Sequence, residues 1–141
     1  MSQTYIRAAL RRLVVERAAG CCEYCRMSQE VGWLPYEIDH IRSEKHGGET
    51  NEDNLCFSCV RCNSLKGSDI AGEDPLTKQA AFLFHPRRQK WVDHFRLNMT
   101  DIEPLSPEGR VTVYVLQLNH PDRIAERELA VQLDLYPCDK A

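Results

Sequence analysis

Two matched pairs of cysteines constrain the fold of this chain more than any other feature. Each pair has the spacing Cys-x-x-Cys, first at Cys22 and Cys25 and again at Cys59 and Cys62. Two thiolates spaced in this way can turn onto one metal ion, and a second pair completes a closed tetrahedral site. Structural zinc contributes on the order of 10 kcal/mol, which exceeds the closure entropy of the long loop between the pairs. The sequence therefore predicts a fold stapled by zinc.

The three remaining cysteines are Cys21, Cys56 and Cys138. Cys56 also forms a Cys-x-x-Cys with Cys59, but it falls on an expected strand, where a free cysteine acts as a small core residue. Pairing Cys59 with Cys62 places both ligands at a strand-to-helix turn, so we prefer that pairing. Neither Cys21 nor Cys138 receives a role. Because no secretory signal is recognised, metal binding is favoured over disulfides, and the cytoplasm is the expected compartment.

Hydrophobic patterning predicts an α+β fold. A length of 141 residues suits one compact domain, 1–141. Short alternating segments predict strands at 37–41 and 55–58, on either side of a polar loop. Helical spacing predicts helices at 4–19 and 59–70.

The second half of the chain shows no composition break that would mark a linker. Ser106-Pro107 has the cap and first-turn residues of a helix start, and Val111 and Val115 fit a helical period. The valines of this segment also favour a strand by propensity, so both readings stay open, with helix preferred. Pro121 is expected to open a last helix that ends near Leu133.

The charge distribution gives mixed guidance on partners. A net charge of −3 argues mildly against nucleic-acid binding, because phosphate contacts need lysine and arginine. Arg87, Arg88 and Lys90 nevertheless form a local basic patch that could contact a DNA backbone, with an ordinary charged surface as the alternative. No apolar run approaches the roughly 18 residues of a membrane span, so no membrane partner is expected.

A set of short motifs in fixed order resembles the HNH endonuclease family over roughly residues 14–67. The motifs are Cys22-x-x-Cys25, Asp39-His40-Ile41, Gly47-Gly48, Asp53-Asn54-Leu55 and Cys59-x-x-Cys62-Asn63-x-x-Lys66-Gly67. The resemblance implies a ββα-metal core of the His-Me finger type, treble-clef-like, at about 14–70, with flanking helices. It also implies a C-terminal extension at about 75–141. The string Leu83-Phe84-His85-Pro86-Arg87 with Trp91, His94 and Phe95 is similar to an extension of small stand-alone bacterial, notably cyanobacterial, members.

The resemblance implies a role for each motif residue. His40 would be the general base, since imidazole titrates near neutral pH. Asp39 and Asn63 would supply oxygen ligands to a catalytic ion, which suits Mg²⁺ or Mn²⁺. Asn54 would pin the loop and orient the histidine, with an ordinary turn asparagine as the alternative. Outside the resemblance, Lys66 could contact phosphate near the metal, and a solvated helix lysine is the equal alternative. Neighbouring residues of a strand face opposite sides, so Asp39 and His40 need a twist, or a metal beside the strand, to act together.

The expected function is metal-dependent hydrolysis of DNA phosphodiester bonds, giving 5′-phosphate and 3′-hydroxyl ends. The cysteine pairs would hold Zn²⁺ for structure, and Mg²⁺ or Mn²⁺ would serve catalysis. Two alternatives remain open from the residues. One is a non-catalytic, zinc-stabilised nucleic-acid-binding module; the other is a nuclease acting on RNA, because the site reads a phosphodiester and not a sugar.

Overall fold

The structure is a computed structural model that describes residues 4–138. The described elements follow the chain as α1 (Ala8–Ala18), β1 (Glu37–His40), a 3-10 turn η1 (Glu44–His46), β2 (Leu55–Ser58), α2 (Val60–Lys66), β3 (Ala71–Glu73), β4 (Ala80–Phe82), α3 (Trp91–His94), β5 (Phe95–Asn98), β6 (Asp101–Pro104), α4 (Pro107–Val115) and α5 (Pro121–Gln132). Helices combined with small antiparallel strand pairs confirm the expected α+β class.

The expected ββα unit is formed by β1, β2 and α2. The strands pair antiparallel with Asp39 opposite Cys56 and His40 opposite Leu55. α2 begins directly after β2, as expected, but it ends at Lys66, a few residues earlier than the sequence suggested. Gly67 follows with φ 53° and ψ −128°, a backbone conformation that favours glycine and stops the helix.

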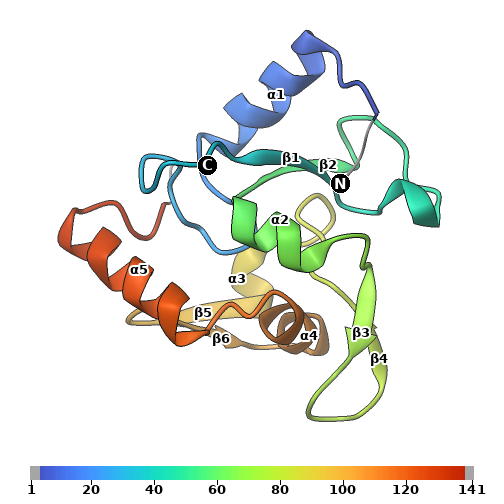
Figure 1. Ribbon diagram of the computed structural model, residues 1–141. Coiled ribbons are helices and arrows are strands. Elements are labelled where there is room, and N and C mark those ends of the chain that lie inside the picture. Colours follow the sequence, from blue (N-terminus) through green and yellow to red (C-terminus); the bar gives the residue numbers. More distant parts are fainter. Residues whose placement is uncertain (1–3, 139–141) are drawn as a thin grey trace.

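The first helix covers one face of this hairpin. Val14 and Ala18 of α1 are fully buried and belong to one cluster with Leu55 and Phe57 of β2. α2 lies on the other side of the hairpin, as Figure 1 shows. The hairpin is therefore enclosed between two helices, with its edge left for the groove described below.

After α2, the described residues form two small hairpins and three helices. The segment after Ser106 forms α4, which confirms the helix reading: the Ser106 Oγ accepts from the Gly109 N–H at 3.0 Å, and Pro107 occupies the first turn. The last helix, α5, begins at Pro121 as expected. The hairpins β3–β4 and β5–β6 were not expected, because strands of three or four residues leave almost no periodic signal.

One hydrophobic cluster joins the core to the extension. It contains Cys22 and Tyr24 from the first half of the chain and Phe84, Phe95 and Leu118 from the second. Among the described residues, no helix combines the length and the apolarity that a membrane crossing requires.

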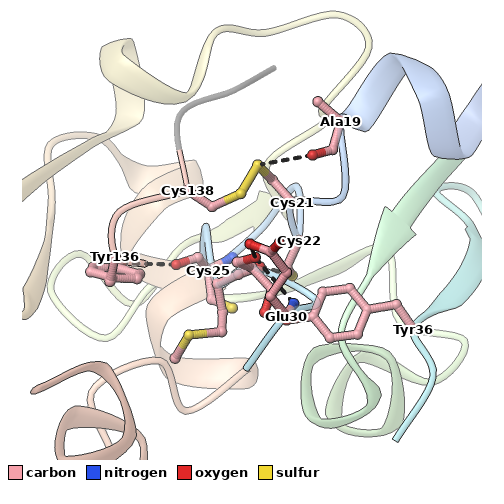
Figure 2. Close-up of a disulfide and its surroundings, with 10 residues drawn as sticks. Ala19, Cys21, Cys22, Cys25, Glu30, Tyr36, Tyr136 and Cys138 are labelled. Carbon is pink, nitrogen blue, oxygen red and sulfur yellow. Dashed lines mark hydrogen bonds between the residues drawn. A yellow bond between two sulfur atoms is a disulfide. The ribbon is translucent and has the colours of Figure 1, made fainter. Parts of the chain in front are cut away.

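The C-terminal segment returns to the first cysteine knuckle. Cys138 forms a disulfide with Cys21, across a sequence separation of 117 (Figure 2). The Tyr136 hydroxyl donates to the Cys25 carbonyl at 2.9 Å, and the Cys138 N–H donates to the Arg26 carbonyl at 2.9 Å. The sequence assigned no role to Cys21 or Cys138, and folding brings these two spare cysteines together in a disulfide.

Candidate active site and metal centre

The four predicted ligand cysteines meet in one buried cluster. The Sγ atoms of Cys22, Cys25, Cys59 and Cys62 all lie within 4.8 Å of one another, and the Cys25 and Cys59 sulfurs are 3.8 Å apart. Zinc–sulfur bonds of about 2.3 Å in a tetrahedron place the sulfurs about 3.8 Å apart. Each pair also folds its second backbone N–H onto the first sulfur, at 3.5 Å in one knuckle and 3.3 Å in the other. The donor set therefore fits zinc.

An arginine of the extension contacts this cluster. Arg123 of α5 is 4% exposed, and its guanidinium donates to the Cys62 Sγ at 3.0 Å and lies 3.7 Å from the Cys59 Sγ. Burial lowers the pKa of Arg123, but the neighbouring cysteine thiolates outweigh it and raise that pKa above its usual value. The contact gives a tetrathiolate site a positive charge that the motif residues do not provide.

Asp39 lies on the side of β1 that faces the first knuckle and α2. Its carboxylate accepts from the Tyr24 hydroxyl at 3.3 Å and pairs with the Lys66 ammonium at 3.1 Å. Lys66 also donates to the His40 carbonyl at 2.9 Å. Burial raises the pKa of Asp39, and the Lys66 charge opposes that rise. The result is a buried ion pair that ties α2 to β1.

This geometry differs from the expectation for Lys66. The residue is 1% exposed and its ammonium is held by Asp39 and the backbone, so it does not reach a phosphate in this arrangement. The helix lysine turns inward because an unpaired carboxylate beneath it would be costly to bury. Cys56, by contrast, is fully buried beside Asp39, as expected for a small core residue.

His40 points to the opposite side of the strand. Its Nε2 lies 2.8 Å from the Thr50 Oγ1, and the residue is 5% exposed. His40, Asp39 and Asn63 all line one open groove of about 940 Å³ at the edge of the hairpin. The strand alternation anticipated from the sequence is present, because the Asp39 carboxylate contacts Tyr24 and Lys66 while the His40 ring contacts Thr50.

Asn54 clamps the loop that joins the two strands. Its Oδ1 accepts from the Arg42 N–H at 2.9 Å, and its Nδ2 donates to the Arg42 and Glu49 carbonyls at 2.9 and 2.8 Å. This is the loop-pinning arrangement expected of it. The clamp requires Gly48, because a Cβ there would stand 1.7 Å from the Arg42 carbonyl oxygen and 2.8 Å from the Asn54 Nδ2. A role of Asn54 in the chemistry stays a prediction.

The expected basic patch divides into two kinds of residue. Arg87 forms an ion pair with Glu23 of the first knuckle, and burial lowers its pKa to about 10. Arg88 and Lys90 are exposed. Arg87 therefore serves to join the extension to the knuckle, which leaves only its two neighbours open to a ligand.

Comparison with known proteins identifies the class of the core. Residues 22–69 match the family model of the HNH endonuclease, which confirms the resemblance carried by the motifs. The match supports a nuclease of the HNH family and spans both cysteine pairs and the whole groove-forming hairpin.

A curated relative extends the likeness into the second half of the chain. The chain is 26% identical over 122 residues to the Septu protein PtuB of Bacillus thuringiensis. The alignment covers 85% of this chain but 43% of that protein, so the chain spans less than half the length of its relative. The search of solved structures found no match.

Three contacts of the site were missed from sequence. Tyr24 lies inside the first knuckle, where a tyrosine between two ligand cysteines gave a weak local signal. Thr50 sits in a polar loop with nothing to mark it as the partner of His40. Arg123 is 61 residues from Cys62 in the chain, and only the fold brings the two together.

Proposed function

We propose that this chain is a metal-dependent endonuclease that hydrolyses DNA phosphodiester bonds and leaves 5′-phosphate and 3′-hydroxyl ends. The main support for the proposal is that His40, Asp39 and Asn63 line one groove in a fold that also forms a zinc-compatible cysteine cluster. The match of residues 22–69 to the HNH endonuclease supports the same reaction class. We further propose that the chain acts as one domain and works in the cytoplasm.

His40 is the proposed general base. Nε2 can donate its proton to the Thr50 hydroxyl, 2.8 Å away, and this bond fixes the ring and its tautomer. The imidazole then presents an unprotonated Nδ1, which can take a proton from water. Such a base accelerates phosphodiester hydrolysis by about 10²–10⁴-fold. Thr50 is thus a positioning residue for His40.

Asp39 and Asn63 are the proposed ligands of a catalytic Mg²⁺ or Mn²⁺. Their oxygen atoms are the donors that hard divalent cations prefer, and both residues line the groove. When bound, such an ion supplies positive charge to the phosphate and the leaving oxygen. The Lys66 charge opposes the rise in the pKa of Asp39 that burial causes, and the ion pair fixes the carboxylate beside β1. Asn54 holds the loop that carries Thr50.

Arg88 and Lys90 are the proposed contacts to the DNA backbone. Both are exposed, and Arg88 lies close to the Asn54 loop. Arg87 and Lys66, expected at first to bind phosphate, are engaged by Glu23 and Asp39 and are assigned to fold stability in this proposal.

The test is cleavage of supercoiled plasmid by the zinc-loaded chain with Mg²⁺ or Mn²⁺, followed by ligation and end-labelling of the products. We expect nicked DNA with ligatable ends from the wild type and none from His40→Ala. His120→Ala, a histidine at the start of α5, controls for preparation effects. Cleavage of RNA alone would favour the RNA nuclease. Binding without cleavage of either polymer would favour the non-catalytic module.

A further inference from the structure

A second hollow lies near the groove, and none of His40, Asp39 and Asn63 lines it. It has a volume of about 440 Å³, within the range of small-ligand pockets. Its walls come from the Asn54 loop on one side and from the extension, residues 82–89, on the other. Ile41 and Arg42 line the hollow, and their chain neighbours His40 and Ser43 line the groove. Because Ile41 and Arg42 directly follow His40, the hollow begins within about 7 Å of the proposed base along the chain.

The polar groups of this hollow have fixed hydrogen-bonding roles. The His85 Nδ1 accepts from the N–H groups of Arg87 and Arg88, each at 3.2 Å. Because Nδ1 accepts both bonds, the ring proton resides on Nε2 as a donor, and burial, which lowers the pKa of His85, favours this neutral form. The Gln89 Oε1 accepts from the His85 N–H at 2.9 Å, which leaves the Gln89 NH₂ as a second donor.

The charge of the hollow disfavours a phosphate. Two arginines, Arg42 and Arg88, face three carboxylates, which belong to Glu49, Asp53 and Glu108. A phosphate inside the hollow would meet more negative than positive charge, so the backbone contact proposed for the exposed Arg88 lies outside it. A neutral group that both accepts and donates hydrogen bonds suits it better.

An aromatic side chain completes the hollow. Phe82, at the end of β4, lines it and is 65% exposed. An exposed phenylalanine beside neutral donors and carboxylate acceptors matches the way proteins hold unstacked bases, by stacking on the face and hydrogen bonding at the edge.

We propose that this hollow binds one nucleobase of the cleaved strand, close to the scissile phosphate. The proposal rests on the proposed nuclease function and deepens it by naming what reads the substrate. Phe82 stacks on the base, while His85 and Gln89 donate to its edge and the carboxylates accept from its amino groups. One base pocket gives the enzyme a preference at one position near the cut.

The experiment removes bases from the substrate and, separately, the stacking side chain from the protein. Oligonucleotides with a single abasic site at successive positions around the cut are bound to the full-length His40→Ala chain and cleaved by the wild type. We expect one position at which base loss weakens binding by about 5- to 100-fold, the range that stacking on an aromatic residue gives. Phe82→Ala should weaken binding of the intact strand equally and abolish the effect of the abasic site. The matched control is Tyr114→Ala, an aromatic of α4 that is 69% exposed and does not line the hollow.

The outcomes of these experiments distinguish the base pocket from the nuclease proposal. A flat abasic scan with normal cleavage by Phe82→Ala would overturn the base pocket and leave the nuclease intact. If base loss weakens binding at one position, and Phe82→Ala removes that effect, the base pocket is supported even when no preparation cleaves DNA. In that case the nuclease proposal alone would fall. Binding of free mononucleotides with a flat scan would also overturn the proposal, because the hollow would then serve a soluble ligand.

Discussion

Replacing Arg123 by methionine should weaken zinc binding more than it weakens the fold. The change removes a charge-assisted hydrogen bond from a buried guanidinium to the Cys62 Sγ at 3.0 Å. Such bonds contribute about 1.5–3 kcal/mol, which corresponds to roughly 10- to 100-fold in affinity. Loss of outer contacts to metal ligands has the same magnitude, about 10- to 100-fold. Competition with a chromophoric zinc chelator measures it directly.

Arg127 supplies the matched control. It lies one turn further along α5 and is 1% exposed, but its guanidinium donates to the Thr100 carbonyl at 2.7 Å and to the Asn119 Oδ1 at 3.1 Å. Arg127→Met should lower the melting temperature as Arg123→Met does, while zinc affinity changes far less. Arg123→Lys should recover part of the affinity. Equal zinc affinities for the two methionine variants would refute the reasoning, since the Arg123 contact would then be mere packing.

Three further perturbations test other parts of the structure. Gly48→Ala should destabilise the fold by about 1–3 kcal/mol and slow cleavage, because its Cβ would displace the Arg42 carbonyl. Urea unfolding and nicking assays measure the two effects, and a fully active variant would contradict the prediction. The Arg110 guanidinium holds the pKa of the buried Asp74 well below its ordinary value through two bonds of 2.9 Å. The pair's contribution is therefore complete above about pH 4 and declines as pH falls below it, so Asp74→Asn should be less stable at neutral pH, with the difference shrinking in acid. A difference in melting temperature that stays constant with pH would exclude this role. Cys138→Ser should lower the free energy of unfolding by up to about 4–5 kcal/mol under oxidising conditions and by almost nothing under reducing conditions. Melting curves of both proteins with and without a dithiol reductant measure this difference.

The sequence indicated those parts of the site that depend on local spacing. Local spacing, over a few positions, marks the paired cysteines, the residues around His40 and the cap at Ser106. The structure has the cysteine cluster and helix α4 at the positions that this spacing predicted. The competing strand propensity of Val111 was outweighed, because Ser106 capping and burial of Val111 in the shared core favour the helix.

Contacts between residues far apart in the chain could not be predicted from the sequence. Nothing near Cys138 shows that it meets Cys21, and nothing near Lys66 shows that its ammonium is needed by a buried carboxylate. Both outcomes follow from burial, which makes unpaired polar groups costly only once the chain has packed. Arg123 belongs to the same class of contact.

The rate of a single turnover shows whether the groove around His40 is a hydrolytic centre. Zinc-loaded wild type and His40→Ala, each in excess over a labelled DNA duplex with Mg²⁺, are compared in cleavage rate and in DNA affinity. We expect His40→Ala to cleave about 10²–10⁴-fold more slowly, with DNA affinity almost unchanged. Equal cleavage rates for the two proteins would contradict it, as would the absence of any cleavage by a folded, zinc-loaded wild type.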